Sequence, residues 1–311
     1  MRIIAFWDQG VRYYADNEAF VDSAKSYTYA EADRELHRIA VAIVGNGFAA
    51  GSRIGVYAPN SNDAWLALLG LMRAEGVWLP INPRNSVDSN VDLADRFGMN
   101  VLFYSRKFNE EVKQIADAVP AVSAFVCIDG EGSIGQNLAD FCEGQPETHQ
   151  PGDEQDGELA AIFGTGGTTG KSKGVLMNHT ALETFFQNYH AHFSYRENSV
   201  HLVVAPMTHT AGIMGCLHFP RGGKNVIYKE VAPLAIMQDI AEHKVSHLFL
   251  PPTVLYMMLA HEQVNDDDDS SLQHFMVGAA PTSLEKLKEA CEVFGPCMTE
   301  AYGQTEAPAA I

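Results

Sequence analysis

The sequence lacks the features of a secreted, disulfide-stabilised or membrane-spanning protein. Its 311 residues include only five cysteines, an odd number, and none forms a C-x-x-C pair, which argues against a disulfide scaffold and a zinc knuckle. The first residues contain no long apolar core followed by small residues, as a signal peptide would. The longest strongly apolar run, 65–72, is far too short to span a bilayer. We therefore expect a soluble, cytoplasmic protein with no transmembrane segment.

Positive charge is also scarce. Lysine and arginine number 21 against 39 aspartates and glutamates, so the formal net charge is −18. Such a surface repels a phosphate backbone, and nucleic acid is therefore not an expected partner. Any anionic ligand must be held by local donors against this field. Because hydrophobic residues make up 46% of the chain and charged residues only 19%, we expect a folded core. The length favours a two-lobed body.

Helical and extended patterns alternate along the chain. Thr28 and Glu31 form a capping box before an amphipathic helix that ends at Gly45 and Gly47. Strands are predicted over 53–59, 77–81, 100–105, 123–129, 158–163, 200–207, 224–230, 246–252 and 273–280. Helices are predicted over 61–76, 91–98 and 109–119 and near 180–193, 233–243, 252–261 and 283–293, with an exposed connector over 143–157. This alternation predicts an α/β fold with a parallel sheet covered by helices.

The stretch IFGTGGTTGKSKGV, residues 162–175, is unusually rich in glycine and hydroxyl groups. A Walker A loop, G-x-x-x-x-G-K-S/T, would need glycine where Thr165 stands. The following KGVLMN predicts extended chain, whereas a Walker A loop opens directly into a helix. Both points disfavour a P-loop kinase or ATPase, although that class stays open. Five glycines permit close backbone approach to a ligand, and Lys171 and Lys173 supply charge, so we expect the stretch to bind a polyphosphate.

At this point the sequence resembles a known family. TGGTTGKSKG resembles the glycine-rich signature of the adenylate-forming enzymes, which include acyl-CoA synthetases, firefly luciferases and the adenylation domains of peptide synthetases. Further segments resemble that family in the same order: LLGLMRAEGVWLPINP at 68–83, APMTHTAG at 205–212, VGAAP at 277–281 and AYGQTE at 301–306. Three positions depart from the usual pattern, since Ser172 replaces a proline, Gly166 a serine and Thr208 an aromatic residue.

The resemblance implies a fold and a domain organisation. It implies helix-covered, mostly parallel sheets in two stacked subdomains of the N-terminal adenylation (AMP-binding) domain. Family members continue well beyond the point that matches Ile311. By resemblance, 1–311 is therefore a truncated N-terminal domain without its C-terminal lid domain, and we expect it to be weakly active or inactive alone.

The function implied by the resemblance is that of an ATP-dependent acid–thiol ligase. Such an enzyme activates a carboxylic acid as an acyl-adenylate, releases pyrophosphate and transfers the acyl group to coenzyme A. ATP, Mg²⁺ and coenzyme A are the implied cofactors, and the acid is a small molecule. Two alternatives remain open: an acyl-AMP ligase that loads a carrier protein, and a catalytically dead nucleotide-binding fragment. The sequence is compatible with a homodimer.

The resemblance also assigns site residues. Catalytic roles fall to His209, Lys173 and Thr305. The implied Mg²⁺ ligands are Glu306 and Thr165, whose hard oxygens suit that ion. The implied nucleotide-binding set is Thr165, Gly166, Gly167, Thr168, Thr169, Gly170, Lys173, Gly278, Ala279, Ala280, Glu300, Ala301, Tyr302, Gly303 and Thr305.

The acid pocket is expected to be apolar. Amino-acid-activating relatives usually place an aspartate in the 205–212 segment, and this chain has Thr208 and His209 with no acid nearby. The expected pocket walls are Met207, His209, Ala211, Gly212, Leu255 and Met258. Apolar and small side chains suit a hydrocarbon or aryl tail, so we expect a fatty or aryl acid. The other histidines, including the pair His190 and His192, are expected to be surface or packing residues.

Overall fold

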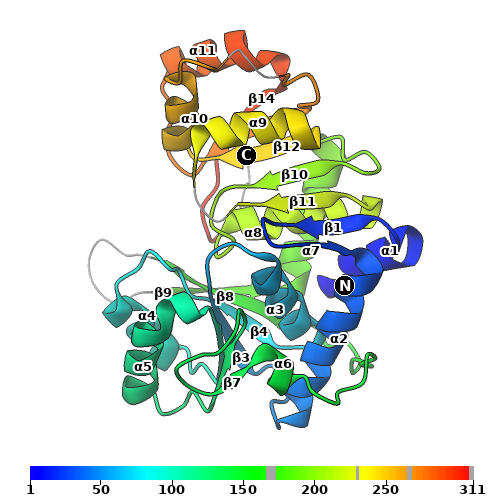
Figure 1. Cartoon of the computed structure of the whole chain (residues 1–311), viewed down its shortest axis with the longest axis vertical. Helices are drawn as coiled ribbons and strands as arrows, with labels where there is room; N and C mark the ends of the chain where they lie inside the picture. The colour runs from blue at the N-terminus through cyan, green and yellow to red at the C-terminus, as the bar shows by residue number, and fades with distance from the viewer. Residues whose placement is uncertain (166–172, 229–230, 265–267, 308–311) are drawn as a thin grey trace. The chain divides into compact units, whose positions relative to one another are not determined.

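The computed structural model describes residues 1–165, 173–228, 231–264 and 268–307, which fall into two compact units (Figure 1). Unit 1 comprises Met1–Ala5 and Ala30–Thr184, and unit 2 comprises Phe6–Tyr29 and Phe185–Ile311. Each unit contains a seven-stranded, mostly parallel sheet. The predicted α/β class with helix-covered, mostly parallel sheets is confirmed. No helix in the described part of the chain is both long and apolar enough to cross a bilayer.

The sheet of unit 1 has the strand order β7-β6-β5-β3-β4-β8-β9. Its parallel strands are β3 (Arg53–Tyr57), β4 (Val77–Pro80), β5 (Val101–Tyr104), β6 (Ala124–Cys127), β7 (Gln136–Asn137) and β8 (Leu159–Thr165). The last strand, β9 (Lys173–Asn178), is antiparallel to β8 and forms a hairpin with it.

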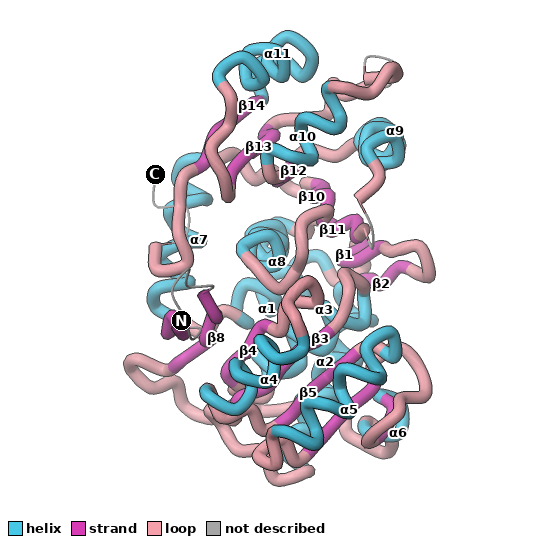
Figure 2. Tube along the Cα trace, turned by 90° about the vertical axis from the view of Figure 1, so that its left-hand side faces the viewer, coloured by secondary structure: helices cyan, strands magenta, loops and turns pink. Residues whose placement is uncertain are grey.

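Helices cover both faces of this sheet. They are α2 (Tyr29–Gly45), α3 (Asn62–Arg73), α4 (Val87–Arg96), η1 (Arg106–Phe108), α5 (Asn109–Ala118) and α6 (Leu138–Phe141). Side chains of β5 alternate between the faces, as a strand requires. Leu102 and Tyr104 are buried in one core cluster with residues of α4 and α5, which lie over this face in Figure 2. Phe103 points the other way and packs edge-on against Phe141 of α6.

The sheet of unit 2 has the strand order β14-β13-β12-β10-β11-β1-β2. Its strands are β1 (Glu18–Val21), β2 (Ser26–Thr28), β10 (Val200–Val203), β11 (Lys224–Ile227), β12 (His247–Leu250), β13 (His274–Gly278) and β14 (Met298–Ala301). Only β2 runs antiparallel to its neighbour. Its helices are α1 (Ile4–Tyr14), α7 (His179–His192), α8 (Thr210–Gly215), η2 (Cys216–Arg221), α9 (Pro233–His243), α10 (Pro252–Leu259), α11 (Leu284–Phe294) and η3 (Gly295–Cys297).

One face of the unit 2 sheet carries the main hydrophobic core. Leu202, Leu248 and Phe275 of β10, β12 and β13 are buried there with residues of α9, α10 and α11. Figure 1 shows α9 lying along β12 on this face. The alternate residues of the same strands therefore point to the opposite face.

The N-terminal residues contain elements that the sequence pattern did not predict. Trp7 of α1 stacks on Phe20 of β1 and on Tyr29, and Phe219 closes the group edge-on. A Cβ at Gly10 would lie 2.5 Å from the Tyr29 ring, so the helix needs glycine to approach it. These strands are short, and β1 pairs with the sequence-distant β11, with Phe20 opposite Asn225. Pairing between segments so far apart in the sequence gives no pattern within either segment from which the strand could be predicted.

Several predicted boundaries shift. Helix α4 begins at Val87, four residues before the predicted start, with Ser86 as its cap. Helix α7 begins at His179, and Asn178 Oδ1 accepts a hydrogen bond from Ala181 N at 2.8 Å. Asn178 therefore caps this helix, which begins one residue before the predicted start near 180.

The predicted connector is held by the second residue of the chain. The Arg2 side chain, only 8% exposed, donates to Glu158 at 2.8 Å, to the Gly152 carbonyl at 2.9 Å and to Glu75 at 3.3 Å. The hydrogen bond from Arg2 lowers the pKa of Glu158. This contact joins the N-terminus, the connector and the end of α3 within unit 1.

Replacement of Arg2 is expected to destabilise the protein strongly. Arg2→Ala leaves two partly buried carboxylates without their cation, and the free energy of unfolding should fall by about 3 kcal/mol in denaturant titrations. The matched control is Arg38→Ala, which removes a more exposed pair with Glu35 and should change stability by less than about 0.5 kcal/mol. Equal losses for the two variants would contradict a special role for Arg2.

Candidate functional site

The candidate site of unit 2 lies at the carboxyl ends of four strands. β10, β12, β13 and β14 are parallel neighbours, so their carboxyl ends meet at the same edge of the sheet. Open parallel sheets bind their ligands at this edge. The segments 205–212, 277–281 and 301–306 each lie at or directly after the end of one of these strands. The fold therefore gathers three of the sequence-predicted segments on one edge.

The ends of β13 and β14 are in direct contact. Gly278 is paired with Ala301, and a Cβ on Gly278 would lie 2.8 Å from the Ala301 carbonyl oxygen. The Thr282 backbone N–H donates to Glu300 Oε1 at 3.3 Å. Ala279 has a φ of +70°, a left-handed conformation that is rare outside glycine. The residues along this edge, including Ala280 and Gly303, carry a methyl group or no side chain.

A tight turn follows β14. Gln304 and Ala307 exchange two backbone hydrogen bonds of 2.9 and 3.2 Å, which places Thr305 and Glu306 at the central positions of the turn. Glu306 is exposed, and Tyr302, just before the turn, is 65% exposed. The turn therefore carries a hydroxyl and an exposed carboxylate at consecutive positions, and such hard oxygens suit Mg²⁺.

The segment after β10 forms two consecutive turns. His209 N donates to the Pro206 carbonyl at 3.2 Å, and Gly212 N donates to the His209 carbonyl at 3.0 Å. The exposed His209 occupies the N-cap position of α8, while Met207 is buried. A Cβ on Gly212 would lie 2.0 Å from the Met207 carbonyl oxygen, so this backbone path requires glycine. The predicted Ala211 side chain lies outside the described part of the structure.

Two further predicted pocket residues lie in the core. Leu255 and Met258 on α10 are both 0% exposed and belong to the main hydrophobic cluster of unit 2. Core packing accounts for their apolar character. Their contact with a substrate stays a prediction.

The glycine-rich stretch begins and ends in the β8–β9 hairpin of unit 1. Thr165 is paired with Lys173, and Gly164 with Gly174. A Cβ on Gly164 would lie 2.5 Å from Leu93, and one on Gly174 would lie 2.5 Å from Phe97, so the hairpin base packs closely on α4 and its cap.

The remainder of the predicted phosphate loop, Gly166, Gly167, Thr168, Thr169 and Gly170, lies outside the described residues. Lys173 is exposed and belongs to unit 1, whereas Thr305 and Glu306 belong to unit 2. Their convergence on one ligand stays a prediction.

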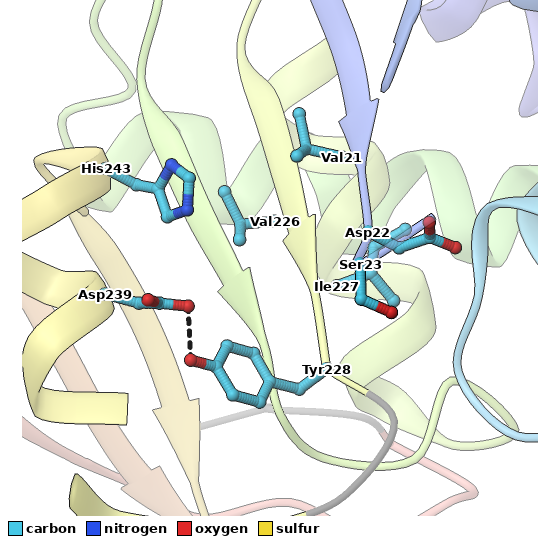
Figure 3. A pocket seen from close by; sticks show the side chains of 8 residues that line it. All are labelled: Val21, Asp22, Ser23, Val226, Ile227, Tyr228, Asp239 and His243. Atoms are coloured by element: carbon cyan, nitrogen blue, oxygen red, sulfur yellow. Dashed lines mark hydrogen bonds between the residues drawn. The ribbon is translucent and has the colours of Figure 1, made fainter. Parts of the chain in front are cut away.

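A pocket of about 330 Å³ lies beside the ends of β1 and β11 (Figure 3). No motif in the sequence marked its lining, which comprises Val21, Asp22, Ser23, Val226, Ile227, Tyr228, Asp239 and His243. The Tyr228 hydroxyl donates to Asp239, and burial together with this carboxylate raises the pKa of the phenol. A triphosphate would meet two carboxylates, Asp22 and Asp239, and the described residues of the lining include no lysine or arginine. The described lining therefore does not favour a nucleotide.

Comparison with known proteins identifies relatives along almost the whole chain. A family model described as AMP-binding enzyme matches residues 6–311. A methyl-dioxo-octahydroindenyl-propanoyl:CoA ligase of Mycobacterium tuberculosis is 26% identical over 96% of this chain and 61% of its own length. The 4-coumarate–CoA ligase-like 1 of Arabidopsis thaliana is 28% identical over 96% of this chain and 56% of its own length. The chain thus spans about three fifths of these relatives.

A solved structure shares the fold. The N-terminal domain of FACL13 from Mycobacterium tuberculosis superposes with a TM-score of 0.88 at 21% identity. The match covers 98% of this chain and 76% of that one. At this level of identity the likeness establishes the architecture and leaves the chemistry to the site residues.

Replacement of Gly212 is expected to disrupt the segment that carries His209. Gly212→Ala forces a methyl group against the Met207 carbonyl, and the free energy of unfolding should fall by about 2 kcal/mol or more. The control is Gly45→Ala at the end of α2, where the nearest atom to a new Cβ is 3.8 Å away. That variant should be neutral or slightly stabilised. Thermal melts that rank the two variants equally would refute the close approach.

Replacement of Ala279 by glycine should reveal local strain. Glycine adopts the left-handed conformation without strain, but it also raises the entropy of the unfolded chain. The two effects oppose each other, so Ala279→Gly should be neutral or stabilising by up to about 1 kcal/mol. Ala191→Gly, at an exposed helical position in α7, should instead cost about 1 kcal/mol. A cost at Ala279 as large as that at Ala191 in denaturant titrations would show that the conformation carries no strain.

Proposed function

The chain belongs to the AMP-binding, adenylate-forming enzyme family, and from that membership we propose that it is an acyl-CoA synthetase-like acid–thiol ligase acting on a fatty or aryl acid. The main support for this proposal is that β10, β12, β13 and β14 end at one edge of the sheet. The segments 205–212, 277–281 and 301–306 follow these strand ends. These segments supply small residues, hydroxyls and a carboxylate of the kinds that nucleotide binding and Mg²⁺ need. The chain spans about three fifths of the length of these relatives, so the activity is proposed for the whole protein.

The chemistry overcomes the poor reactivity of a carboxylate. In the first step an oxygen of the acid attacks the α-phosphorus of ATP, the bond to the β-phosphate oxygen breaks, and pyrophosphate leaves. In the second step the thiolate of coenzyme A attacks the acyl carbon, and AMP leaves. Both steps depend on holding anions together in the correct orientation and on neutralising charge.

The proposed roles divide between the two units. Lys173, at the start of β9, neutralises charge on the β- and γ-phosphates, with the glycine-rich loop around them. Thr305 donates its hydroxyl to the α-phosphate, and Tyr302 borders the adenine beside Ala279. Glu306 and Thr165 would hold Mg²⁺, which would neutralise charge on the phosphate oxygens.

The acid is proposed to lie beside the segment after β10. His209 sits at the start of α8, and Met207, Ala211 and Gly212 flank it in sequence. No acidic side chain follows β10 in this segment, which disfavours an amino-acid substrate. Apolar and small neighbours favour a hydrocarbon or aryl tail.

A phosphotransferase built on a Walker A loop is the weaker candidate. In that architecture a helix follows the loop directly, and its N-terminus faces the phosphates. In this structure Lys173 opens the antiparallel strand β9, and the next helix begins only at His179. The local architecture therefore favours adenylate formation.

Acid-dependent exchange of labelled pyrophosphate into ATP is the test of the proposed function. We expect the whole protein to catalyse exchange that requires octanoate or benzoate as a representative acid, with AMP and not ADP as the product of turnover, and residues 1–311 alone to show little or none. Lys173→Ala should weaken ATP binding about 10-fold, and Lys171→Ala should weaken it less, because only Lys173 is assigned to the phosphates.

Equal losses for the two lysine variants would contradict the assigned position of Lys173 in the loop. Steady conversion of ATP to ADP would contradict adenylate formation. Acyl transfer from the adenylate to an acyl carrier protein, without transfer to coenzyme A, would contradict the proposed acceptor alone.

A further inference from the structure

Histidines from three neighbouring strands form a row across the unit 2 sheet. His201 of β10 is paired with His247 of β12, which is paired with His274 of β13. His218 of η2 covers this row, since its ring stacks on His201 with centroids 5.0 Å apart and meets His247 edge-on at 4.7 Å. These four residues are called the histidine ladder below. They lie near the amino ends of the strands, opposite to the candidate nucleotide edge.

The ladder is buried on the face of the sheet away from the main hydrophobic core. His201, His218 and His247 are 2%, 1% and 5% exposed, and His274 is half-buried. Tyr195, also buried, stacks on His247 with centroids 4.7 Å apart. Buried imidazoles that stack in this way are suited to the neutral form, because a charged ring would lose its hydration.

Hydrogen bonds assign the proton on two of the rings. His201 Nδ1 lies 2.9 Å from Asn225 Oδ1, and the Asn225 amide nitrogen donates to the Gly215 carbonyl at 3.2 Å, so His201 is the donor. Ser246 Oγ donates to the Val200 carbonyl at 3.1 Å and must therefore accept from His247 Nδ1 at 2.8 Å. In His247 this leaves Nε2 as an acceptor.

A second proton on His247 would bind at Nε2 and would make the ring a cation without solvent around it. This nitrogen is buried and has no hydrogen-bond partner. The adjoining cavity has a volume of about 10 Å³ and is lined by Phe193, Tyr195, His201, Met214, His218, His247, Leu248, His274 and Met276. This is the lower limit for one water molecule. A proton on His247 would therefore find no hydration shell and no carboxylate in the cavity lining. A backbone hydrogen bond with Ser194 favours the charged ring, but burial outweighs it and lowers the pKa.

The groups around the ladder add to the free-energy cost of protonating it. From the chain after α7, Tyr195 contacts His218 and His247, and behind it His190 stacks on Tyr195 while Tyr189 donates to Met276. Burial lowers the pKa of His274, and the positive charge of Arg196 lowers it further. From η2 come His218 and Arg221, and the Arg221 charge lowers the pKa of His190 after the effect of burial.

Burial is the first cause of a lowered pKa at each ladder position. It lowers the pKa of His201 to about 4 and of His247 to about 3. The pKa of His218 falls well below its usual value through burial and the neighbouring imidazoles. Protonating one ring opposes protonation of the next, because like charges on paired strand positions repel.

The geometry of the ladder does not favour metal binding. His201 and His218 stack face to face, whereas His218 meets His247 edge-on and His247 lies tilted against His274. Among the described residues, no group of three histidine, cysteine, aspartate or glutamate side chains is placed to hold a metal ion.

We propose that the histidine ladder is an acid-sensitive switch that opens unit 2. Protonation at the amino ends of β10, β12 and β13 separates the paired strands and so displaces the segments at their carboxyl ends. The switch acts through stability, and it does not depend on the proposed ligase activity.

The direction of the effect follows from proton linkage. An imidazole in the unfolded chain titrates near pH 6.5, above the folded-state value of each buried ladder residue. Below pH 6.5 the unfolded chain therefore binds more protons than the folded one. The ladder's stabilising effect is complete above this pH and is lost as the pH falls toward 4.

The test is the pH dependence of unfolding in denaturant. For the three fully buried imidazoles, the unfolding equilibrium constant should rise by about 500-fold between pH 6 and pH 5. His247→Gln removes one titrating group, and the rise should become about 10-fold smaller. The matched control is His192→Gln, at an exposed position of α7, which should leave the wild-type dependence unchanged. Identical dependence for wild type and His247→Gln would overturn the proposal.

Hydrogen exchange of the wild-type protein tests the same proposal if the His247→Gln variant does not fold. After correction for intrinsic rates, backbone amides of β10, β12 and β13 should lose protection between pH 6.5 and pH 5, while those of β3, β4 and β5 in unit 1 keep it. Equal loss in both sheets, or no loss in either, would overturn the switch.

Discussion

The parallel alignment of β10, β12, β13 and β14 is the constraint on which the candidate site depends. Parallel neighbours bring their carboxyl ends to one edge, so residues separated by long stretches of sequence become neighbours without any local interaction between them. The contact of Gly278 with the Ala301 carbonyl shows how closely two of these ends approach. The absence of side chains larger than a methyl group at Gly278 and Ala279 then leaves the edge open. The family's nucleotide chemistry is thus compatible with a feature of the sheet itself.

The same strands join the candidate site to the stability of unit 2. At their amino ends, β10 and β12 carry buried imidazoles and β13 a half-buried one, in place of the aliphatic residues that usually fill such positions. At their carboxyl ends they carry the segments assigned to the nucleotide and the acid. In the proposed switch, loss of strand pairing at one end displaces the groups at the other. Unit 1 has no comparable row among its described strands, where the buried positions of β3, β4 and β5 are mostly aliphatic or aromatic.

The sequence predicted well what depends on local pattern. The alternation of apolar stretches predicted most strands and helices, and the glycine-rich stretch was correctly placed before extended chain that begins at Lys173. Long-range pairing was not predictable in this way. The pairing of β1 with β11 and the stacking of Trp7 on Tyr29 depend on residues far apart in the chain. The burial of Arg2 against the connector likewise leaves no periodic signal.

Within the candidate site, motifs predicted segments better than individual contacts. The motif at 205–212 does not reveal that Gly212 must be glycine to approach the Met207 carbonyl. Nor does the apolar pattern of α10 distinguish a pocket wall from the core in which Leu255 lies. The ladder was missed because single histidines at separate strand starts become a row only after the strands pair.

The central claim is that the glycine-rich hairpin of unit 1 and the turn after β14 in unit 2 bind the same triphosphate. Hydrogen exchange across an ATP titration measures this directly. The account predicts that peptides covering 162–175 and 301–307 gain protection together, with one half-saturating ATP concentration. Protection of one peptide without the other would contradict it.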